Sequence, residues 1–250
     1  MVAVFVHGNP ETPVVWAPLL AELSLTDAIA LHLPGFGSPV PDGFGATKEE
    51  YAAWLAGELR TIVERSGPVD LVSHDWGGIL APYVVGQHPE LVRSWASDVL
   101  GIFHPDYVWH DFAQIWQTPG AGEEFFAQTM ATPVEDRIAG YEAIGIPRPT
   151  GTQLVAASDE LMSTCILALY RSAVQPEMAR WGTLLDGCAT RPGLSVFAPN
   201  DPFVRGLDLA SQVADRLGAR RVEMVGQGHW WMLGDPPGAA AMLREFWGSL

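Results

Sequence analysis

The stretch that decides the fold is Val69-Asp70-Leu71-Val72-Ser73-His74-Asp75-Trp76-Gly77-Gly78, in which a short apolar run stops abruptly and two glycines open a helical pattern. This pattern predicts a buried strand, a tight turn and then a helix, with Asp75 at the apex of the turn. Ser73 and Gly77 flank the apex because such a turn brings backbones close together and leaves no room for large side chains. The N–H groups and dipole at the start of the helix favour a negative charge on Asp75, which is therefore a nucleophile that needs no activating base.

An aspartate at this apex limits the kinds of substrate carbon that the protein could attack and release again. A serine that displaced a leaving group from a saturated carbon would form an ether, which an activated water could not cleave. The same displacement by Asp75 forms an ester whose carbonyl belongs to the protein, and water can hydrolyse that ester and restore the carboxylate. The expected electrophile is therefore an sp3 carbon. The alternative interpretation is that Asp75 only caps the helix, as aspartate often does.

Length and composition favour one large domain and exclude several classes of partner. A chain of 250 residues is long enough for one α/β domain with an insertion. A net charge of −15 argues against binding to nucleic acid and to anionic membrane surfaces. Cys165 and Cys188 fit no metal spacing and could in principle pair, but we interpret them as reduced thiols in a cytoplasmic protein. No run of residues has the pattern of a signal peptide or the length of a membrane span.

Strands and helices are expected to alternate at both ends of the chain but not in the middle. The expected strands cover 2–6, 28–33, 69–73, 92–99, 194–198 and 221–225, and the expected helices cover 15–25, 47–65, 76–87, 207–217 and 238–247. Residues 104–191 contain no convincing strand and are rich in Trp, Phe and Met. We interpret 104–191 as a helical cap inserted into a core made of 1–103 and 192–250, with an apolar surface above the turn.

Two motifs carry a family resemblance. Ser73–Gly78, together with His7-Gly8-Asn9-Pro10, resembles the Asp-nucleophile branch of the α/β-hydrolase superfamily, which contains epoxide hydrolases, haloalkane dehalogenases and fluoroacetate dehalogenases. The resemblance implies an α/β-hydrolase fold, with a mostly parallel sheet and an inserted helical cap. Family members usually have two further strands before the first one found here, so we expect a sheet shortened at its N-terminal edge. The resemblance also implies that Asn9 and Trp76 supply backbone N–H groups to an oxyanion hole.

Two loops after the cap are expected to complete a catalytic triad. Asp201 follows the strand that ends at 198, and His229 follows the strand that ends at 225. The chain order of nucleophile, acid and histidine is that of α/β-hydrolases, and both loops lie at carboxyl ends of parallel strands. We predict that His229 activates water for attack on the Asp75 ester and that Asp201 orients the imidazole. Asp98 is the alternative acid, because one branch of the dehalogenases places its acid in that region.

The leaving group separates the reactions of the family. An epoxide oxygen leaves as an alkoxide and needs a proton donor, whereas a halide needs only N–H groups that solvate it. Tyr170 lies in a segment similar to the late-cap segment where epoxide hydrolases carry one of two ring-opening tyrosines. The position of Glu11 in the first loop is also similar to the sequence of epoxide hydrolases. The first of the two cap tyrosines is missing, because Ile115 and Trp116 stand where it is expected.

The prediction for the activity is an epoxide hydrolase that forms a vicinal diol, with Tyr170 as proton donor. The alternative is a haloalkane dehalogenase, because Asn9 with Trp76 resembles the halide-binding pair of many such enzymes. Fluoroacetate dehalogenases resemble the chain less, since Arg follows their nucleophile. A remote alternative is a small-molecule receptor without turnover on the same fold.

The remaining expectations concern the pocket and its partners. Four aromatic residues are candidates for the substrate pocket, namely Trp109, Phe112, Trp116 and Trp230. They favour a small apolar substrate, which would react with water. No cofactor or metal is expected, since no ligand cluster or phosphate-binding glycine loop is found. We also expect that the protein can form a homodimer.

Overall fold

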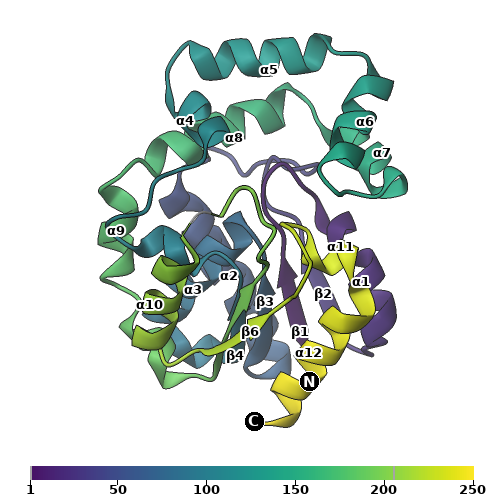
Figure 1. Ribbon diagram of the computed structural model, residues 1–250. Coiled ribbons are helices and arrows are strands. Elements are labelled where there is room, and N and C mark those ends of the chain that lie inside the picture. The colour runs from purple at the N-terminus through teal and green to yellow at the C-terminus, as the bar shows by residue number, and fades with distance from the viewer. Residues whose placement is uncertain (1, 205) are drawn as a thin grey trace.

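The computed structural model describes residues 2–204 and 206–250. Its centre is a sheet of six parallel strands in the order β2-β1-β3-β4-β5-β6 (Figure 1). The strands are β1 Ala3–Val6, β2 Ala28–Leu31, β3 Val69–Ser73, β4 Val92–Ser97, β5 Gly193–Phe197 and β6 Arg220–Glu223. This is the parallel α/β sheet that the sequence predicts.

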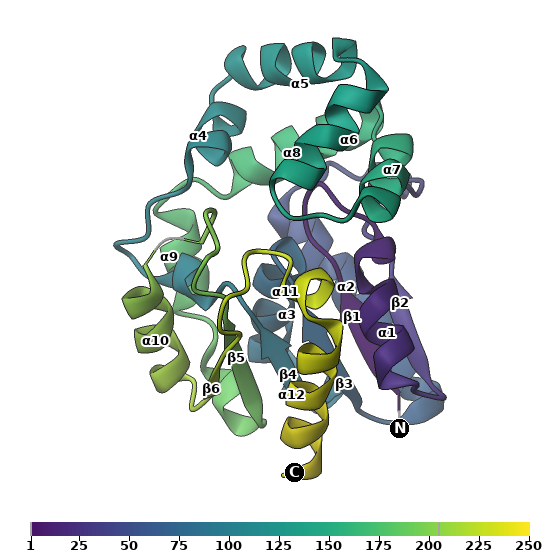
Figure 2. The ribbon, with the colours of Figure 1, turned by 45° about the vertical axis from the view of Figure 1, so that its right-hand side comes forward.

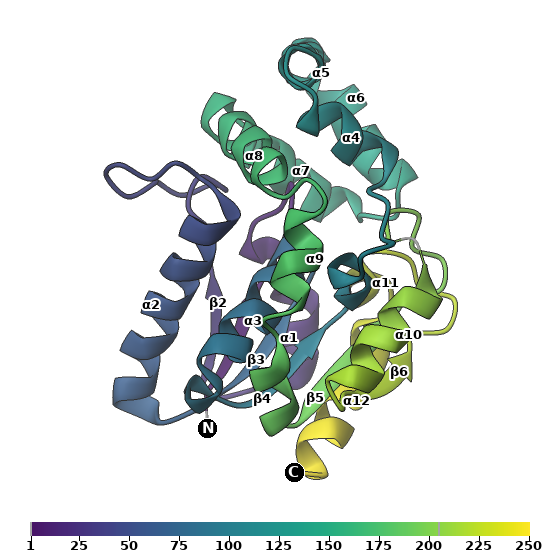
Figure 3. The same ribbon diagram turned by 90° about the vertical axis from the view of Figure 1, so that its left-hand side faces the viewer.

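Helices cover both faces of the sheet and create two hydrophobic cores. On one face lie α1 Ala17–Leu23, α11 Trp231–Gly234 and α12 Pro236–Gly248 (Figure 2). On the other lie α2 Lys48–Ser66, α3 Trp76–Gln87 and α10 Leu207–Arg216 (Figure 3). Strand residues alternate between the cores: Val4 packs with α2 and α3, and Phe5 packs with α1 and α12. This alternation is the two-residue period of a strand covered on both faces.

Six helices lie between β4 and β5. They are α4 Asp111–Gln117, α5 Ala121–Ala131, α6 Val134–Ala143, α7 Arg148–Ala157, α8 Glu160–Ser172 and α9 Glu177–Gly182. The views in Figures 1 to 3 agree that α4 to α8 lie above the end of the sheet at which β3 leads into α3. No strand occurs between β4 and β5, a stretch that the structure describes completely. Whether this segment is a separate domain with boundaries at 104 and 191 stays a prediction.

Element ends differ from the expected ones where local chemistry decides them. The expected helix 15–25 is a 3₁₀ turn over Pro13–Trp16 followed by α1, because Thr12 caps the turn and Ser24 ends α1 in the left-handed region. The expected strand 221–225 ends at Glu223, and Val225 is exposed. Both cysteines are buried and free. Within the described ranges, no helix is long and apolar enough to span a membrane.

Candidate active site

Asp75 lies at a strained turn between β3 and α3. Its backbone has φ 49° and ψ −119°, outside the regions that a residue with a side chain normally occupies. A Cβ atom on Gly77 would lie 2.3 Å from the carbonyl oxygen of Val6, and one on Gly8 would lie 2.2 Å from Oδ1 of Asp75. The close approach of the turn to β1 and its following loop therefore requires glycine at both positions.

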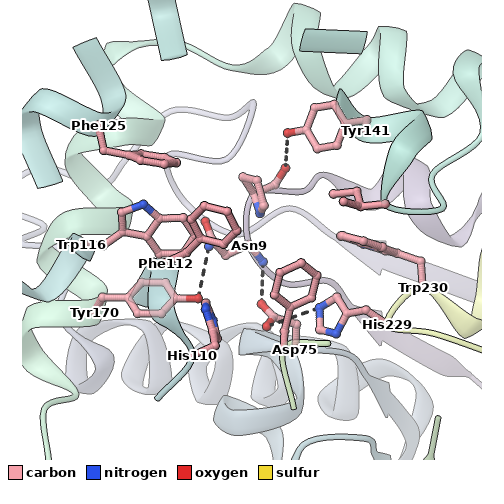
Figure 4. Close-up of a pocket in the computed structure, with 13 residues that line it drawn as sticks. Asn9, Asp75, His110, Phe112, Trp116, Phe125, Tyr141, Tyr170, His229 and Trp230 are labelled. Atoms are coloured by element: carbon pink, nitrogen blue, oxygen red, sulfur yellow. Dashed lines mark hydrogen bonds and ion pairs between the residues drawn. The ribbon is translucent and has the colours of Figure 1, made fainter. Parts of the chain in front are cut away.

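The three residues predicted as a triad meet at this turn. His229 Nε2 lies 3.7 Å from Asp75 Oδ2 (Figure 4), and His229 Nδ1 donates to Asp201 Oδ2 at 2.7 Å. Asp201 is itself held by its loop, because its Oδ1 accepts from the backbone N–H groups of Phe203 and Val204. The histidine is therefore oriented by Asp201 through Nδ1, and its other nitrogen faces Asp75.

The charges of these residues depend on one another. Burial raises the pKa of Asp75, and although His229 opposes this effect, the pKa rises to about 6. Burial lowers the pKa of His229, but Asp201 and Asp75 outweigh burial and raise it above the ordinary value. Burial would raise the pKa of Asp201, yet its pKa is lowered because His229 and two backbone N–H groups stabilise the carboxylate. The site therefore favours an ionised Asp201 beside a basic His229.

A second buried charged network lies directly under the triad. The imidazole of His74 lies between two carboxylates, with Nδ1 2.5 Å from Asp98 Oδ2 and Nε2 3.1 Å from Glu11 Oε1. Burial opposes a positive charge on His74, but Asp98 and Glu11 raise its pKa well above the usual value. Its ring centroid is 4.5 Å from that of His229. Asp98 therefore pairs with His74, whereas Asp201 pairs with His229.

This network connects the loops that form the site. Asp98 Oδ1 accepts the backbone N–H of Asp75 at 3.1 Å, and Oδ2 accepts the indole N–H of Trp231. Glu11 accepts the backbone N–H of Gly8 at 3.0 Å and the indole N–H of Trp230 at 2.5 Å. The carboxylates on either side of His74 therefore tie together the Asp75 turn, the loop after β1 and the segment that follows His229.

Potential metal-ligand atoms of Glu11, His74 and His229 lie within 4.8 Å of one another. All three side chains are already used in the two networks: Glu11 binds His74, and His229 binds Asp201. The arrangement is accounted for by these hydrogen bonds, and a cation here would have to compete with the positive charge favoured on His74.

Asn9 connects Asp75 with Tyr170. Its backbone N–H donates to Asp75 Oδ1 at 2.7 Å, and its side-chain Nδ2 donates to the Tyr170 hydroxyl at 3.3 Å. Figure 4 shows the Tyr170 hydroxyl directed toward Asn9. The buried indole N–H of Trp76 has no partner with normal hydrogen-bond geometry among the described residues. Burial raises the pKa of Tyr170 well above its usual value, and Asp75 adds to this effect, while the Trp76 and Asn9 N–H groups oppose it.

A cavity of about 140 Å³ opens above Asp75. Of the predicted pocket residues, Phe112, Trp116 and Trp230 line this cavity. The prediction for Trp109 is wrong: it lies behind Tyr170 and donates its indole N–H to the carbonyl of Ala173. Trp76 is fully buried and does not line the cavity, because the ring of Tyr170 covers it at a centroid distance of 5.1 Å.

Besides Pro10 of the His7-Gly8-Asn9-Pro10 motif, five residues that line this cavity were not predicted as pocket residues, namely His110, Phe125, Tyr141, Ile144 and Phe203. Phe203 carried a weak signal, because it lies two residues after Asp201 and therefore in the same loop. The others come from helical segments after β4, and their positions depend on how those helices pack. Tyr141 supplies a second cavity tyrosine, but its hydroxyl is directed at the carbonyl of Pro10, 3.5 Å away, and not at Asp75 (Figure 4).

Comparison with known proteins agrees with this fold. Residues 3–242 match the alpha/beta hydrolase family, so the chain belongs to that family. A haloalkane dehalogenase from Bradyrhizobium diazoefficiens (USDA 110) is 27% identical over 176 residues, which cover 62% of this chain and 53% of that enzyme. The chain thus matches about half of the length of this curated relative.

Solved structures extend the likeness to nearly the whole chain. E-2-(acetamidomethylene)succinate hydrolase superposes with a TM-score of 0.72 at 18% identity, covering 99% of this chain and 91% of that one. Haloalkane dehalogenase DbeA from Bradyrhizobium elkani USDA94 gives 0.65 at 20% identity, covering 100% and 91%. A thioesterase domain from the curacin biosynthetic pathway gives 0.70 at 15% identity, covering 98% and 90%. These identities show a shared fold, and the named enzymes perform different reactions on it.

Proposed function

We propose that this protein is a hydrolase that attacks an sp3 carbon with Asp75 and forms an alkyl ester on its own chain. The single observation that carries this proposal is the placement of Asp75 between His229, at 3.7 Å, and the backbone N–H of Asn9, at 2.7 Å. The carboxylate oxygen that faces the cavity can act as the nucleophile. The N–H of Asn9 can then stabilise the oxyanion that forms when water attacks the ester.

Ester formation itself prepares the second step. The negative charge of Asp75 contributes to the raised pKa of His229. When Asp75 becomes an ester that charge disappears, the pKa of His229 falls, and a larger fraction of the imidazole is neutral. Neutral His229 takes a proton from water, the hydroxide adds to the ester carbonyl, and the alcohol product leaves with the proton from His229. Asp201 stabilises the imidazolium between these two transfers.

The leaving group that the geometry supports best is an epoxide oxygen. The Tyr170 hydroxyl accepts a hydrogen bond from Asn9, so its own proton is free to be donated into the cavity, and its high pKa keeps that proton in place. When Asp75 opens the ring, the carbon–oxygen bond breaks toward oxygen, which takes the proton from Tyr170. After hydrolysis, the second proton of water passes from the regenerated Asp75 carboxyl to the Tyr170 phenolate, and the product is a vicinal diol.

A second candidate is haloalkane dehalogenation, the reaction for which the relative from Bradyrhizobium diazoefficiens is named. One feature of the site favours it as well. The buried indole N–H of Trp76 has no partner with normal hydrogen-bond geometry among the described residues, and the Asn9 amide lies beside Asp75, so a shift of Tyr170 would leave both donors for a halide. In the present arrangement the Tyr170 hydroxyl already accepts from Asn9 and covers Trp76. Because the Tyr170 side chain already lies against both donors, we favour epoxide hydrolysis over haloalkane dehalogenation.

Intact-mass measurement of His229→Gln tests both candidates, because loss of the base should trap the ester on Asp75. Incubation with a terminal epoxide should add the whole mass of the epoxide. An alkyl adduct without bromine after incubation with a bromoalkane would instead support the dehalogenase. The double variant with Asp75→Asn is the control and should give no adduct. If neither probe reacts with His229→Gln and the unsubstituted protein turns over neither, the proposal fails and the receptor alternative gains support.

A further inference from the structure

A second cavity of about 210 Å³ continues from the one above Asp75. It lies among α4, α5, α6 and α8, which stand together at the top of Figure 1. The two cavities share five lining residues, Pro10, Trp116, Phe125, Tyr141 and Ile144. The additional wall is formed mainly by apolar side chains such as Phe126, Met130, Met162 and Ile166. A substrate that reaches Asp75 can therefore extend an apolar chain into this second space.

The second cavity has an unusual charge for this protein. Among the described residues that line it, Arg137 is the only charged one, although acidic residues outnumber basic ones by 29 to 14 in the chain. Arg137 forms no hydrogen bond or ion pair with any residue in the described ranges. Arg148, which lies nearby on α7, binds both Glu135 and Glu142. Arg137 is thus a half-buried cation beside an apolar space without a protein anion to neutralise it.

Arg137 lines the second cavity and lies on the same helix as Tyr141, which lines both cavities. It precedes Tyr141 by one helical turn on α6, so both side chains lie on the same face of that helix. Burial raises the pKa of Tyr141 to about 12, and a bond to Ser158 and the charge of Arg137 oppose that rise. Thr129, Ser158 and Ser163 also line this cavity, and each hydroxyl donates to the main-chain carbonyl four residues earlier. A cation without an ion-pair partner among the described residues, at the edge of an apolar chamber, suits a carboxylate.

We propose that the second cavity binds the distal part of an amphipathic substrate, an unbranched apolar chain that ends in a carboxylate, with Arg137 as its counter-ion. The proposal rests on the proposed function only in placing the reacting carbon at Asp75. The chain passes Trp116, Phe125 and Tyr141, and its carboxylate meets Arg137. The substrate class is therefore a long-chain acid that carries its reactive group away from the carboxylate.

Binding of unreactive probes tests this inference without turnover. Isothermal titration calorimetry with octanoate and octan-1-ol compares two chains of the same length that differ in charge. The unsubstituted protein should bind octanoate about fivefold more tightly, the factor expected for one partly exposed ion pair. Arg137→Gln should remove this preference, and Arg148→Gln, the matched control on the neighbouring helix, should keep it. Salt at 0.5 M should weaken octanoate binding and leave octan-1-ol binding unchanged.

A second variant locates the probe. Gly140 lines only the second cavity, and a Cβ atom there meets no atom within 4 Å, so Gly140→Leu is expected to fold and to fill the space. It should weaken binding of both probes, and leave the reaction of a two- or three-carbon substrate with Asp75 unchanged. Equal affinity for the two probes, or a preference for octanoate that survives Arg137→Gln, would overturn the inference. Absence of any Asp75 adduct combined with the expected binding pattern would overturn only the proposed function.

Discussion

His74 donates through Nδ1 to Asp98, at 2.5 Å, and this pair lies beneath the triad without belonging to it. Asp98 also accepts the backbone N–H of Asp75, the proposed nucleophile. The ring of His74 lies against that of His229, whose acidic partner is Asp201. The site thus contains two histidine–aspartate pairs with different contacts: Asp201 orients His229, the proposed base, and Asp98 holds the turn that carries Asp75, the proposed nucleophile.

The two aspartates should therefore respond differently to the same substitution. Asp201→Asn should lower turnover about 10³- to 10⁴-fold and let the Asp75 ester accumulate, because the imidazole loses the partner that orients it. Asp98→Asn should leave the bond between His229 and Asp201 intact. It should instead lower the free energy of unfolding by about 3 kcal/mol, because it removes one partner of a buried ion pair. Single-turnover kinetics and urea denaturation of both variants separate the effects. If the ester accumulated in Asp98→Asn but not in Asp201→Asn, Asp98 and not Asp201 would be the triad acid.

Tyr170→Phe should distinguish the two candidate leaving groups. Loss of the phenolic proton should slow epoxide opening about 10²-fold or more, which is the usual contribution of a general acid. Displacement of a halide needs no proton, so reaction with a bromoalkane should be unchanged or faster, since the amide of Asn9 is then free. Rapid-quench measurement of ester formation reports this step directly. Tyr141→Phe is the matched control, because the Tyr141 hydroxyl is directed at Pro10 and should not affect either rate. Equal epoxide rates for Tyr170→Phe and the unsubstituted protein would exclude Tyr170 as the donor.

The sequence was sufficient to predict which residues meet at the candidate site wherever their position depends on local pattern. Asp75, Asp201 and His229 each follow a strand of a parallel sheet, and such strand ends meet at one edge whatever the loops do. The links of His74 to Glu11 and Asp98 were not predicted, because these contacts join residues 63 and 24 positions apart and depend on the exact approach of three loops. Trp109 was misplaced for a related reason: aromatic content favours a pocket wall, but which ring faces the cavity depends on helix packing.

Asp75→Asn should stabilise the folded protein at neutral pH. The folded pKa of Asp75 is raised from 3.8 to about 6, so the folded state binds this proton more tightly than the unfolded state does. Protonated Asp75 therefore stabilises the fold fully below pH 3.8, and this contribution is lost as the pH rises through about 6. At pH 7.5 the ionised Asp75 carboxylate lowers the free energy of unfolding by about 1–3 kcal/mol. Asparagine removes that cost and tolerates the positive φ of this turn.

Urea denaturation at pH 7.5 and pH 4.5 measures the effect of Asp75→Asn, and the gain should shrink at the lower pH. Asp201→Asn serves as a comparison in which the free energy of unfolding should change in the opposite direction. Because its folded pKa is lowered, Asp201 contributes stability above its unfolded pKa and loses it as pH falls. Its replacement should therefore destabilise the protein at pH 7.5. A loss of stability in Asp75→Asn at pH 7.5 would contradict the strained and desolvated state that we infer for the nucleophile.

Two glycine substitutions test how tightly the turn is constrained. Gly77→Ala should lower the free energy of unfolding by about 1–3 kcal/mol and reduce ester formation, because the new methyl group would lie 2.3 Å from the carbonyl oxygen of Val6 and the turn must move. Gly57→Ala is the matched control within α2, where a Cβ atom meets no atom within 4 Å. It should raise stability by about 0.5–1 kcal/mol through helix propensity and leave ester formation unchanged. If the two variants had the same stability and the same ester-formation rate, the close approach of Gly77 to β1 would not be what holds Asp75 in position.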